Sequence, residues 1–327
     1  MSFRIKIKDT DYEFENHGSE SLLDSALNAG IPVSYGCSNG NCGDCAGWLK
    51  SGELRQLRHS DHVFASSEKA KGRFLLCTHS ANSDLQIEAA TAGGSEEIPL
   101  QEIAVKVRKV NQINEQVATL DVQTPRTHRL RFLAGQWAEV SDGKQFAFRL
   151  PIASCPCDDR NLQFHLPLQT DECLSASQLL SSSKGMTLTL QGPYGDFVLN
   201  QNSTRPRLMI GSAFGFPPLK SIIEHSLSLT PEIPIDLVWL EQPEQIHYMD
   251  NHMRMWDDAL DNFTLHRIQC VAMSGQSPAP ETMELMTGFF RQDRDIYVAG
   301  PVELSELVNE MIESFNLSTE NFHRCVV

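Results

Sequence analysis

Four cysteines in the first quarter of the sequence have a spacing that suits metal binding. Cys37, Cys42 and Cys45 follow a C-x4-C-x2-C pattern, and Cys77 comes after 31 further residues. Deprotonated thiols are soft, charged ligands, and iron bound to sulfide prefers such ligands. A zinc site and a set of buried or disulfide-bonded cysteines are the alternatives, but the pattern matches the paired spacing of zinc sites poorly.

The residues between these cysteines favour an iron–sulfur site. The spacing is that of a plant-type [2Fe–2S] centre. Gly36, Gly40 and Gly43 permit unusual backbone angles, so that amide N–H groups can turn toward the cluster sulfurs. Such hydrogen bonds stabilise the extra negative charge of the reduced state. We therefore expect the four thiolates to hold a [2Fe–2S] cluster that moves single electrons.

Three further groups of residues are weaker candidates. Cys155-Pro156-Cys157 could bind a metal, but no second ligand pair lies nearby in the sequence, so we interpret it as free cysteines in a turn. His59 and His62 lie in a polar stretch and are interpreted as solvated loop histidines. The pair 247–248 (His-Tyr) follows an apolar run and could border a nucleotide, although a surface position is the simpler interpretation.

Composition and charge limit the partners. The chain has 327 residues, which suggests two or three domains, and 42 acidic against 27 basic residues give a net charge of −15. Nucleic acid and anionic membranes both need a basic surface, so neither is expected as the main partner. The acidic excess is concentrated in residues 204–327, which hold 18 acidic and 8 basic residues.

The N-terminal sequence and the lack of a long apolar run predict a cytoplasmic location. The first ten residues lack the apolar core of a signal peptide, and no apolar run approaches the roughly 18–20 residues that span a bilayer. Nine cysteines, an odd number, favour metal ligation or free thiols over disulfides in such a chain. We expect no integral membrane segment.

Periodicity divides the chain into three parts. The first is predicted to contain a hairpin (3–7 and 12–14), a helix (21–29) capped by Ser21 and a closing strand (85–89), before a Gly-rich linker at 91–97. The second is rich in short β-like runs at 103–110, 117–124, 146–150, 162–168, 186–190 and 196–199, with one helical stretch at 175–180. The third alternates apolar runs (208–211, 235–241, 296–300) with helices (217–229, 250–260, 302–315), a βαβ pattern that predicts a mainly parallel sheet.

Two segments closely resemble the plant-type ferredoxin domain. They are SYGCSNGNCGDCAGWLKSG at 34–52 and FLLCTHSANSDLQIE at 74–88. The resemblance implies a β-grasp-like ferredoxin domain over residues 1–93. The predicted fold class is α+β and α/β multidomain, with a small antiparallel β-barrel over 98–203 and a βαβ nucleotide-binding-like domain over 204–327.

This order of domains resembles the ferredoxin–NAD(P)H reductase-like electron-transfer components of bacterial oxygenases, and the CDP-6-deoxy-hexose reductase branch shares it. The resemblance implies that NAD(P)H gives a hydride to FAD. It also implies that single electrons then pass to the cluster and on to a redox partner protein such as an oxygenase component. Nicotinamide reacts by two electrons and a cluster by one, and a flavin can do both.

Two motifs of the barrel resemble flavin-binding elements of that family. Residues 134–137 (Ala-Gly-Gln-Trp) resemble its P-G-Q-aromatic element, and residues 192–197 (Gly-Pro-Tyr-Gly-Asp-Phe) resemble its G-P-x-G-x-F element. The flavin-binding candidates implied by these matches are Gln136, Trp137, Gly192, Tyr194 and Gly195.

The family's flavin signature, R-x-Y-S-x-A-S, aligns with residues 148–154 and matches only in part. Ala153 and Ser154 are retained, whereas Leu150 and Pro151 occupy the positions of the stacking aromatic and of the serine that bonds the flavin. Phe148 occupies the arginine position and Arg149 is next to it, but adjacent strand residues face opposite sides. Of a second element, a basic residue followed by G-x-x-S, only Ser175 remains.

The nicotinamide motifs are similarly incomplete. The family's G-G-T-G-x-A-P aligns with residues 212–218, where Gly215 and Pro218 match and the bulky Phe214 replaces threonine. Its C-G-P-P element aligns with residues 299–302, which retain Gly300 and Pro301 behind an alanine. Gln242 stands where an arginine would bind a 2′-phosphate, so NADH is expected rather than NADPH.

Two functions follow from this pattern. The first is an NAD(P)H-dependent, FAD-containing oxidoreductase that feeds electrons through its cluster to an oxygenase or similar acceptor. The alternative is a non-catalytic electron carrier or partner subunit, whose cluster works while the other two domains have lost flavin and nicotinamide binding.

Overall fold

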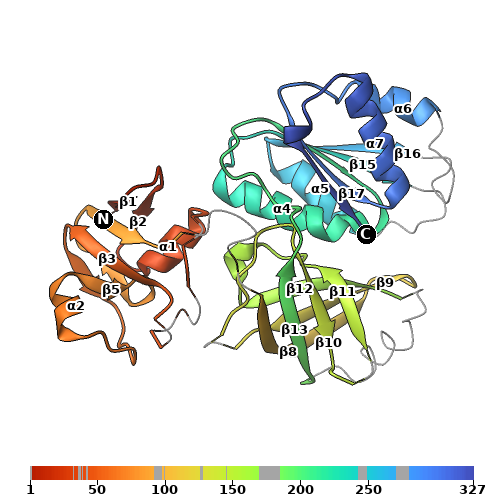
Figure 1. Cartoon of the computed structure of the whole chain (residues 1–327). Helices are drawn as coiled ribbons and strands as arrows, with labels where there is room; N and C mark the ends of the chain where they lie inside the picture. Colours follow the sequence, from red (N-terminus) through yellow and green to blue (C-terminus); the bar gives the residue numbers. More distant parts are fainter. Residues whose placement is uncertain are drawn as a thin grey trace.

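The structure is a computed structural model of the chain. It describes residues 2–31, 33–35, 38, 40–41, 43–91, 98, 100–125, 128–144, 146–168, 185–241, 249–269 and 280–327, without the side chains of 280–283. The polypeptide forms three bodies in sequence order, each built on its own sheet (Figure 1). The N-terminal body lies beside the other two, which are stacked on each other.

The first body has a five-stranded sheet in the order β2-β1-β7-β3-β5. Its elements are β1 (Phe3–Ile7), β2 (Glu13–Asn16), α1 (Leu22–Asn28), β3 (Ala46–Ser51), β4 (Leu54–Gln56), α2 (Ser66–Ala70), β5 (Arg73–Leu75), η1 (Leu76–Thr78), β6 (His79–Ala81) and β7 (Leu85–Ala89). The predicted hairpin is β1 and β2, and β1 pairs with β7 in parallel. The predicted helix is capped as expected, because the Ser21 hydroxyl accepts a hydrogen bond from the Asp24 amide at 3.1 Å.

The second body is a six-stranded antiparallel barrel in the order β11-β10-β13-β8-β9-β12. The strands are β8 (Gln101–Gln112), β9 (Val117–Gln123), β10 (Trp137–Ser141), β11 (Ala147–Pro151), β12 (Asn161–Pro167) and β13 (Thr187–Tyr194). A short turn, η3 (Pro156–Asp158), joins β11 to β12. The Ala153 amide donates to the Gln163 carbonyl oxygen at 2.8 Å, which draws the two outer strands together and nearly closes the barrel.

The third body has a five-stranded parallel sheet in the order β16-β15-β14-β17-β18. Its elements are β14 (Arg207–Gly211), η4 (Ala213–Gly215), α4 (Phe216–Leu229), β15 (Ile235–Glu241), α5 (Asp250–Ala259), β16 (Phe263–Gln269), α6 (Pro280–Thr287), β17 (Asp295–Gly300), α7 (Val302–Ser314), η5 (Thr319–Asn321) and β18 (Phe322–Val326). Apolar clusters on both faces pack the sheet between α4 and α5 on one side and α6 and α7 on the other. No helix in the described part of the chain is long and apolar enough to cross a membrane.

The predicted fold class is confirmed, with one local error. The apolar run at 196–199 was expected as a strand, but β13 ends at Tyr194 and the chain leaves the sheet at Gly195, whose φ is 92°. Phe197 and Leu199 are buried there in the core that the barrel shares with the third body. Burial against a neighbouring body therefore explains the apolar run. Several elements carried no predicted counterpart: β3, β4, α2, β5 and β6 of the first body, β10 of the barrel, and β16, α6 and β18 of the third body. The predicted helix at 175–180 lies outside the described residues.

Candidate functional site

The cysteine-rich loop and the segment around Cys77 are joined inside the first body. Cys45 and Cys77 are 3% and 1% exposed, and both belong to the apolar core of that body. The Leu76 amide donates to the Cys45 carbonyl oxygen at 3.0 Å, which holds the two segments together. The other two predicted ligands, Cys37 and Cys42, lie outside the described residues, as does Gly36.

Two glycines of this loop occupy positions that only glycine fits. Gly40 and Gly43 have φ angles of 92° and 90°, a region that L-residues with a Cβ rarely adopt. A Cβ on Gly43 would lie 2.4 Å from the His62 ring, and one on Gly40 would lie 2.8 Å from Thr78. The buried Ser38 hydroxyl has no hydrogen-bond partner in the described part of the chain. Soft thiol donors, a tight glycine loop and an unsatisfied hydroxyl fit a [2Fe–2S] cluster.

The retained barrel motifs form an aromatic surface on the outside of β10, β11 and β13. Trp137 stacks on Tyr194, with ring centroids 4.4 Å apart and planes at 22°. The Arg149 guanidinium lies 5.8 Å from the centre of the Trp137 ring, within the range of a cation–π contact. Glu139 stands opposite Arg149 in the strand register. This surface presents flat rings and one cation.

Gln136, Gly192 and Gly195 support that surface from behind. The Gln136 side chain is 2% exposed, and its amide nitrogen donates to the Gly195 carbonyl oxygen at 3.0 Å. Its amide oxygen accepts a hydrogen bond from the Leu133 amide at 2.7 Å. A Cβ on Gly192 would lie 3.0 Å from that of Ala138 on the neighbouring strand. These three residues fix the path of the chain beside Trp137 and Tyr194.

The strand register separates Arg149 from its two neighbours. Phe148 and Leu150 are 2% and 5% exposed and belong to the barrel core, whereas Arg149 projects outward. The alignment places Leu150 where an aromatic ring would stack on the flavin. In the structure Leu150 points into the barrel, and the outward ring comes instead from Trp137 on the paired strand.

Ala153 and Ser154 lie where the barrel meets α4. The Ala153 carbonyl oxygen accepts a hydrogen bond from the Lys220 ammonium at 3.0 Å, and that of Ser154 accepts one from the Ser221 hydroxyl at 2.8 Å. Lys220 also pairs with Glu224 at 2.8 Å. These residues join the two bodies. Ser175, the remaining flavin candidate, lies outside the described residues.

The nicotinamide motifs converge at the carboxyl ends of β14 and β17. A Cβ on Gly215 would lie 1.9 Å from the Ala299 carbonyl oxygen, so only glycine permits this approach. A Cβ on Gly300 would lie 3.0 Å from the Ser212 hydroxyl, which is buried without a hydrogen-bond partner in the described part of the chain. In open α/β sheets, ligands bind outside the carboxyl ends of the strands.

Pro218 and Pro301 lie at the N-terminal ends of the helices that leave this edge. Pro218 is buried in the first turn of α4, and Pro301 is the N-cap residue of α7. Phe214 is partly buried and packs against the adjoining apolar core. Gln242 and residues 247–248 lie outside the described residues.

Known proteins share these features. Residues 5–82 match the model of the 2Fe-2S iron-sulfur cluster binding domain. The first body is a ferredoxin domain. The terephthalate 1,2-dioxygenase reductase component 1 of Comamonas sp is 25% identical over 332 residues, covering 99% of this chain and 96% of that protein. The CDP-6-deoxy-L-threo-D-glycero-4-hexulose-3-dehydrase reductase of Yersinia pestis is 26% identical over 241 residues, 73% of this chain and 71% of that protein.

Solved structures share the fold. The ferredoxin reductase in carbazole 1,9a-dioxygenase superposes with a TM-score of 0.57 at 21% identity, covering 100% of this chain and 98% of that one. The Amycolatopsis cytochrome P450 reductase GcoB superposes with a TM-score of 0.58 at 19% identity and covers 98% of each chain. The resemblance to oxygenase reductases predicted from the motifs is confirmed.

The ferredoxin domain contacts the barrel next to the cluster loop. Tyr35, two residues before Cys37, is 6% exposed. Its burial, and then the adjacent carboxylate of Asp159 in the barrel, raise the pKa of Tyr35 well above its ordinary value. Asp159 pairs with Arg129 at 2.7 Å. The ferredoxin domain and the barrel are thereby packed together close to the predicted cluster ligands.

His59 and His62, both predicted to be solvated loop histidines, differ in their surroundings. The His59 side chain is 87% exposed and lies 3.6 Å from Asp61. His62 packs edge-on against Phe64, with ring centroids 4.7 Å apart, and its ring covers Gly43 of the cluster loop. His62 therefore supports the loop.

The cysteines at 155 and 157 have a partner that the sequence did not reveal. His225 of α4 lies 3.4 Å from each sulfur. A hydrogen bond from Cys155, together with the His225 ring and the Ser228 hydroxyl, lowers the pKa of Cys157 against the opposing effect of burial. The same contact with Cys157, followed by burial, raises the pKa of Cys155. His225 comes 68 positions after Cys157, and this separation explains why no sequence pattern joined them.

Proposed function

We propose that this chain is an electron-transfer reductase that passes electrons from NAD(P)H through FAD to a [2Fe–2S] cluster and on to a partner protein. The observation that carries the proposal is the ferredoxin domain packed against a reductase-like barrel in one chain, with Tyr35 at the contact. A flavin links the two-electron chemistry of nicotinamide to the one-electron chemistry of a cluster.

The proposed ligands follow from the described contacts. Cys45 and Cys77, together with Cys37 and Cys42, would hold the cluster. On the barrel, the stacked rings of Trp137 and Tyr194 offer a flat apolar surface. Arg149 beside them offers a guanidinium, whose planar fork suits phosphate oxygens. We assign FAD to this outer face.

For the nicotinamide cofactor we propose the edge formed by Gly215 and Gly300. Two backbone segments approach closely there, and the buried Ser212 hydroxyl has no hydrogen-bond partner in the described part of the chain. The third body carries the acidic excess, with 18 acidic and 8 basic residues over 204–327, which disfavours an additional phosphate. NADH is therefore proposed in preference to NADPH.

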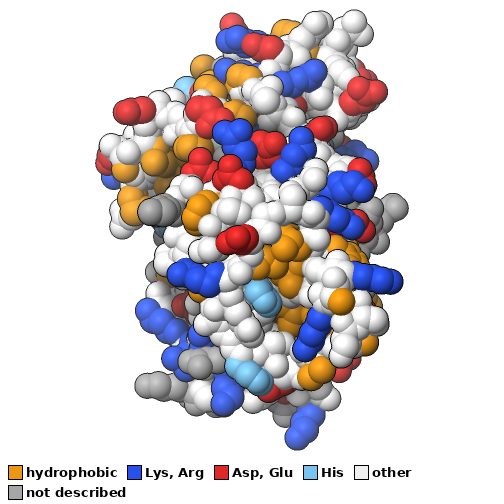
Figure 2. All heavy atoms as spheres, turned by 90° about the vertical axis from the view of Figure 1, so that its left-hand side faces the viewer, with side chains coloured by type: hydrophobic (Ala, Val, Ile, Leu, Met, Phe, Trp, Pro, Cys, Tyr) orange, Lys and Arg blue, Asp and Glu red, His pale blue; other side chains and the backbone are white. Residues whose placement is uncertain are grey.

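The proposed partner is an oxygenase component. The relative from Comamonas sp is named as a dioxygenase reductase component, and one from Gordonia sp. (strain TY-5), 24% identical over 289 residues, as the reductase component of propane 2-monooxygenase. On the face where the ferredoxin domain lies, Lys and Arg side chains are mixed with Asp and Glu in the upper half of the view, and in the lower half they are scattered rather than forming a continuous basic area (Figure 2). This distribution supports a protein partner over nucleic acid. We retain 1–93, 98–203 and 204–327 as the domain bounds and the cytoplasm as the location.

A second function, a non-catalytic electron carrier, is favoured by specific replacements. Phe148 and Leu150 occupy flavin-signature positions and lie in the barrel core. Phe214 fills a position at the nicotinamide edge where the family has a smaller residue. In this alternative the cluster works, and the barrel and α/β domain serve as a docking scaffold.

One experiment separates the two functions. Flavin is extracted from protein purified with two irons per chain, and NADH is then added to the intact protein under argon. The reductase should contain about one FAD per two irons, and NADH should bleach the visible absorption of the cluster. Iron without flavin and an unchanged spectrum would instead establish the carrier.

A further inference from the structure

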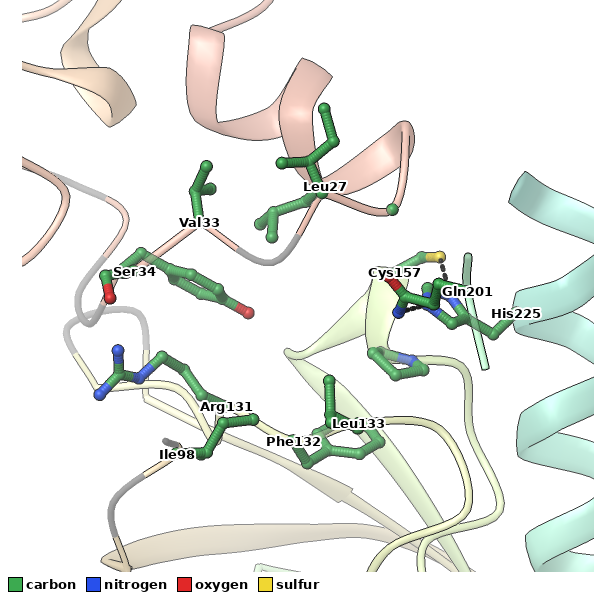
Figure 3. A pocket seen from close by; sticks show the side chains of 14 residues that line it. Leu27, Val33, Ser34, Ile98, Arg131, Phe132, Leu133, Cys157, Gln201 and His225 are labelled. Carbon is green, nitrogen blue, oxygen red and sulfur yellow. Dashed lines mark hydrogen bonds between the residues drawn. The ribbon is translucent and has the colours of Figure 1, made fainter. Parts of the chain in front are cut away.

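A second set of metal-binding side chains lies away from the cluster loop. The sulfurs of Cys155 and Cys157 and one ring nitrogen of His225 all lie within 4.8 Å of one another. The two sulfurs are 2.7 Å apart, and His225 Nδ1 is 3.4 Å from each. Figure 3 shows Cys157 and His225 pointing toward each other at one side of a pocket, from the barrel and from α4.

The local fold explains why the two sulfurs meet. Pro156 begins the short helix η3, and its fixed φ favours a tight turn there. The Cys157 amide donates to the Cys155 sulfur at 3.3 Å, and this hydrogen bond directs the Cys155 side chain back over the turn. Both thiols are partly exposed, so an ion can reach them.

Neighbouring side chains on both sides fix the orientation of the His225 ring. It is 4% exposed, and its Nε2 lies 3.1 Å from the side-chain amide of Gln201. If the Gln201 amide is rotated by 180°, its oxygen accepts a hydrogen bond from Nε2–H of His225. A metal-bound histidine normally donates such a hydrogen bond from its second ring nitrogen. The Ser228 hydroxyl lies 3.2 Å from the Cys157 sulfur and donates to the His225 carbonyl oxygen at 2.7 Å.

The distances suit a small tetrahedral ion. Zinc with Zn–S of about 2.3 Å and Zn–N of about 2.1 Å would separate sulfur from nitrogen by about 3.6 Å and the two sulfurs by about 3.8 Å. Both sulfur–nitrogen distances, at 3.4 Å, are close to that value. The sulfur–sulfur distance must open by about 1 Å, which rotation of a partly exposed cysteine side chain can supply.

We propose that Cys155, Cys157 and His225 form a Zn²⁺ site that is separate from the iron–sulfur cluster. Two thiolates and one imidazole match the ligand preference of zinc, and water or the Ser228 hydroxyl completes the tetrahedron. The site joins the β11–β12 connection to α4, because its ligands come from two bodies. It also adjoins a pocket that Tyr35 of the ferredoxin domain lines, so the ion lies near the meeting point of all three bodies.

The competing arrangement is a disulfide between Cys155 and Cys157. A disulfide has an S–S length of about 2.05 Å and uses neither an imidazole nor a hydroxyl. The placement of His225 Nδ1 at equal distances from both sulfurs, with Ser228 beside them, favours the ion.

The test is metal analysis of the full chain, purified under argon without chelator to two irons per chain and dialysed against Zn²⁺ and then against metal-free buffer. We expect one zinc per two irons in the natural protein. C155S, C157S and H225Q should each retain less than one tenth of that zinc while keeping two irons, which shows that the ferredoxin domain is intact. C325S removes a partly buried thiol from β18 and is the matched control, with one zinc expected.

X-ray absorption at the zinc edge adds a second measurement. Two sulfur and two nitrogen or oxygen neighbours support the site, whereas four sulfur neighbours would mean that zinc had entered the cluster cysteines. The proposal is overturned if the natural protein holds no zinc at two irons per chain, or if C157S keeps its zinc. A peptide containing 155–157 that is two hydrogens lighter and resists alkylation in the anaerobic protein would establish the disulfide instead.

Discussion

The Lys220 ammonium lies 3.0 Å from the Ala153 carbonyl oxygen, and this contact crosses from α4 to the barrel. Lys220 is 6% exposed, and its second partner is Glu224 at 2.8 Å. A buried ammonium needs such partners because removal from water is costly. The interface that would hold flavin and nicotinamide against each other is therefore stabilised by a charged group as well as by apolar contact.

Replacing Lys220 by methionine should destabilise the protein. The change leaves the partly buried Glu224 without its closest cation and removes a hydrogen bond across the interface, for an expected loss of about 2–3 kcal/mol. Urea unfolding followed by circular dichroism measures the loss. K220M/E224Q should recover part of it, because the uncompensated charge is gone. Equal stability of K220M and the natural protein would show that the contact contributes nothing.

His165 should make stability depend on pH. Burial, followed by the charges of Lys220 and His252, lowers the pKa of His165 to about 3, against an unfolded value near 6.5. The folded protein keeps this ring neutral while the unfolded chain takes up a proton below pH 6.5. The stability that the neutral His165 ring contributes is therefore fully present above pH 6.5, and it is lost as the pH decreases toward 3. Between pH 7.5 and 5.5 this histidine accounts for a loss of about 1.4 kcal/mol.

The variant H165Q isolates this contribution. Its free energy of unfolding should fall by about 1.4 kcal/mol less than that of the natural protein over the same pH interval. Some dependence should persist, because burial also lowers the pKa values of His79 and His323. Identical pH slopes for the two proteins would rule out a neutral buried His165.

Local sequence patterns predicted most of the fold. The helix α1 is predicted by its cap at Ser21, and the strands β14 and β15 are predicted by their apolar runs. Each of these patterns lies within about ten residues, so it can be recognised in the sequence. The apolar run around Phe197 was wrongly predicted to be a strand, because an apolar segment can be buried by a neighbouring body without forming a strand.

The candidate sites depended more on register and distance. Only strand pairing shows that Arg149 shares the outer face with Trp137 while Leu150 faces inward. His225 meets Cys157 across two bodies, and no spacing rule covers such a contact. The cluster motif could be recognised in the sequence because its first three predicted ligands lie within a stretch of nine residues.

Arg149 should contribute to flavin affinity if FAD lies on the outer face of the barrel. Losing a charge-assisted contact to phosphate costs about 1.5 kcal/mol or more, so R149M should weaken FAD binding about tenfold or more. Iron content should remain at two per chain. R108M is the control, because Arg108 is exposed on β8 of the same barrel. Titration of flavin-depleted protein with FAD measures the affinity. Equal affinities in R149M and R108M would place the flavin elsewhere.

Gly43 should be essential for loading the cluster. G43A places a Cβ at a φ of 90° and 2.4 Å from the His62 ring, so either the loop or the ring must move. We expect iron to fall below one per chain. G143A also has a positive φ, 74°, but no atom lies within 4 Å of its Cβ, so backbone strain of about 1 kcal/mol should leave two irons per chain.

A second substitution at His62 distinguishes collision from strain at this glycine. In G43A/H62A the ring is absent, and the double variant should regain iron relative to G43A if the collision with His62 caused the loss. The iron content of both variants and their absorption spectra give the result. If G43A holds two irons with a natural spectrum, the tight contact between His62 and the loop is not required for the cluster.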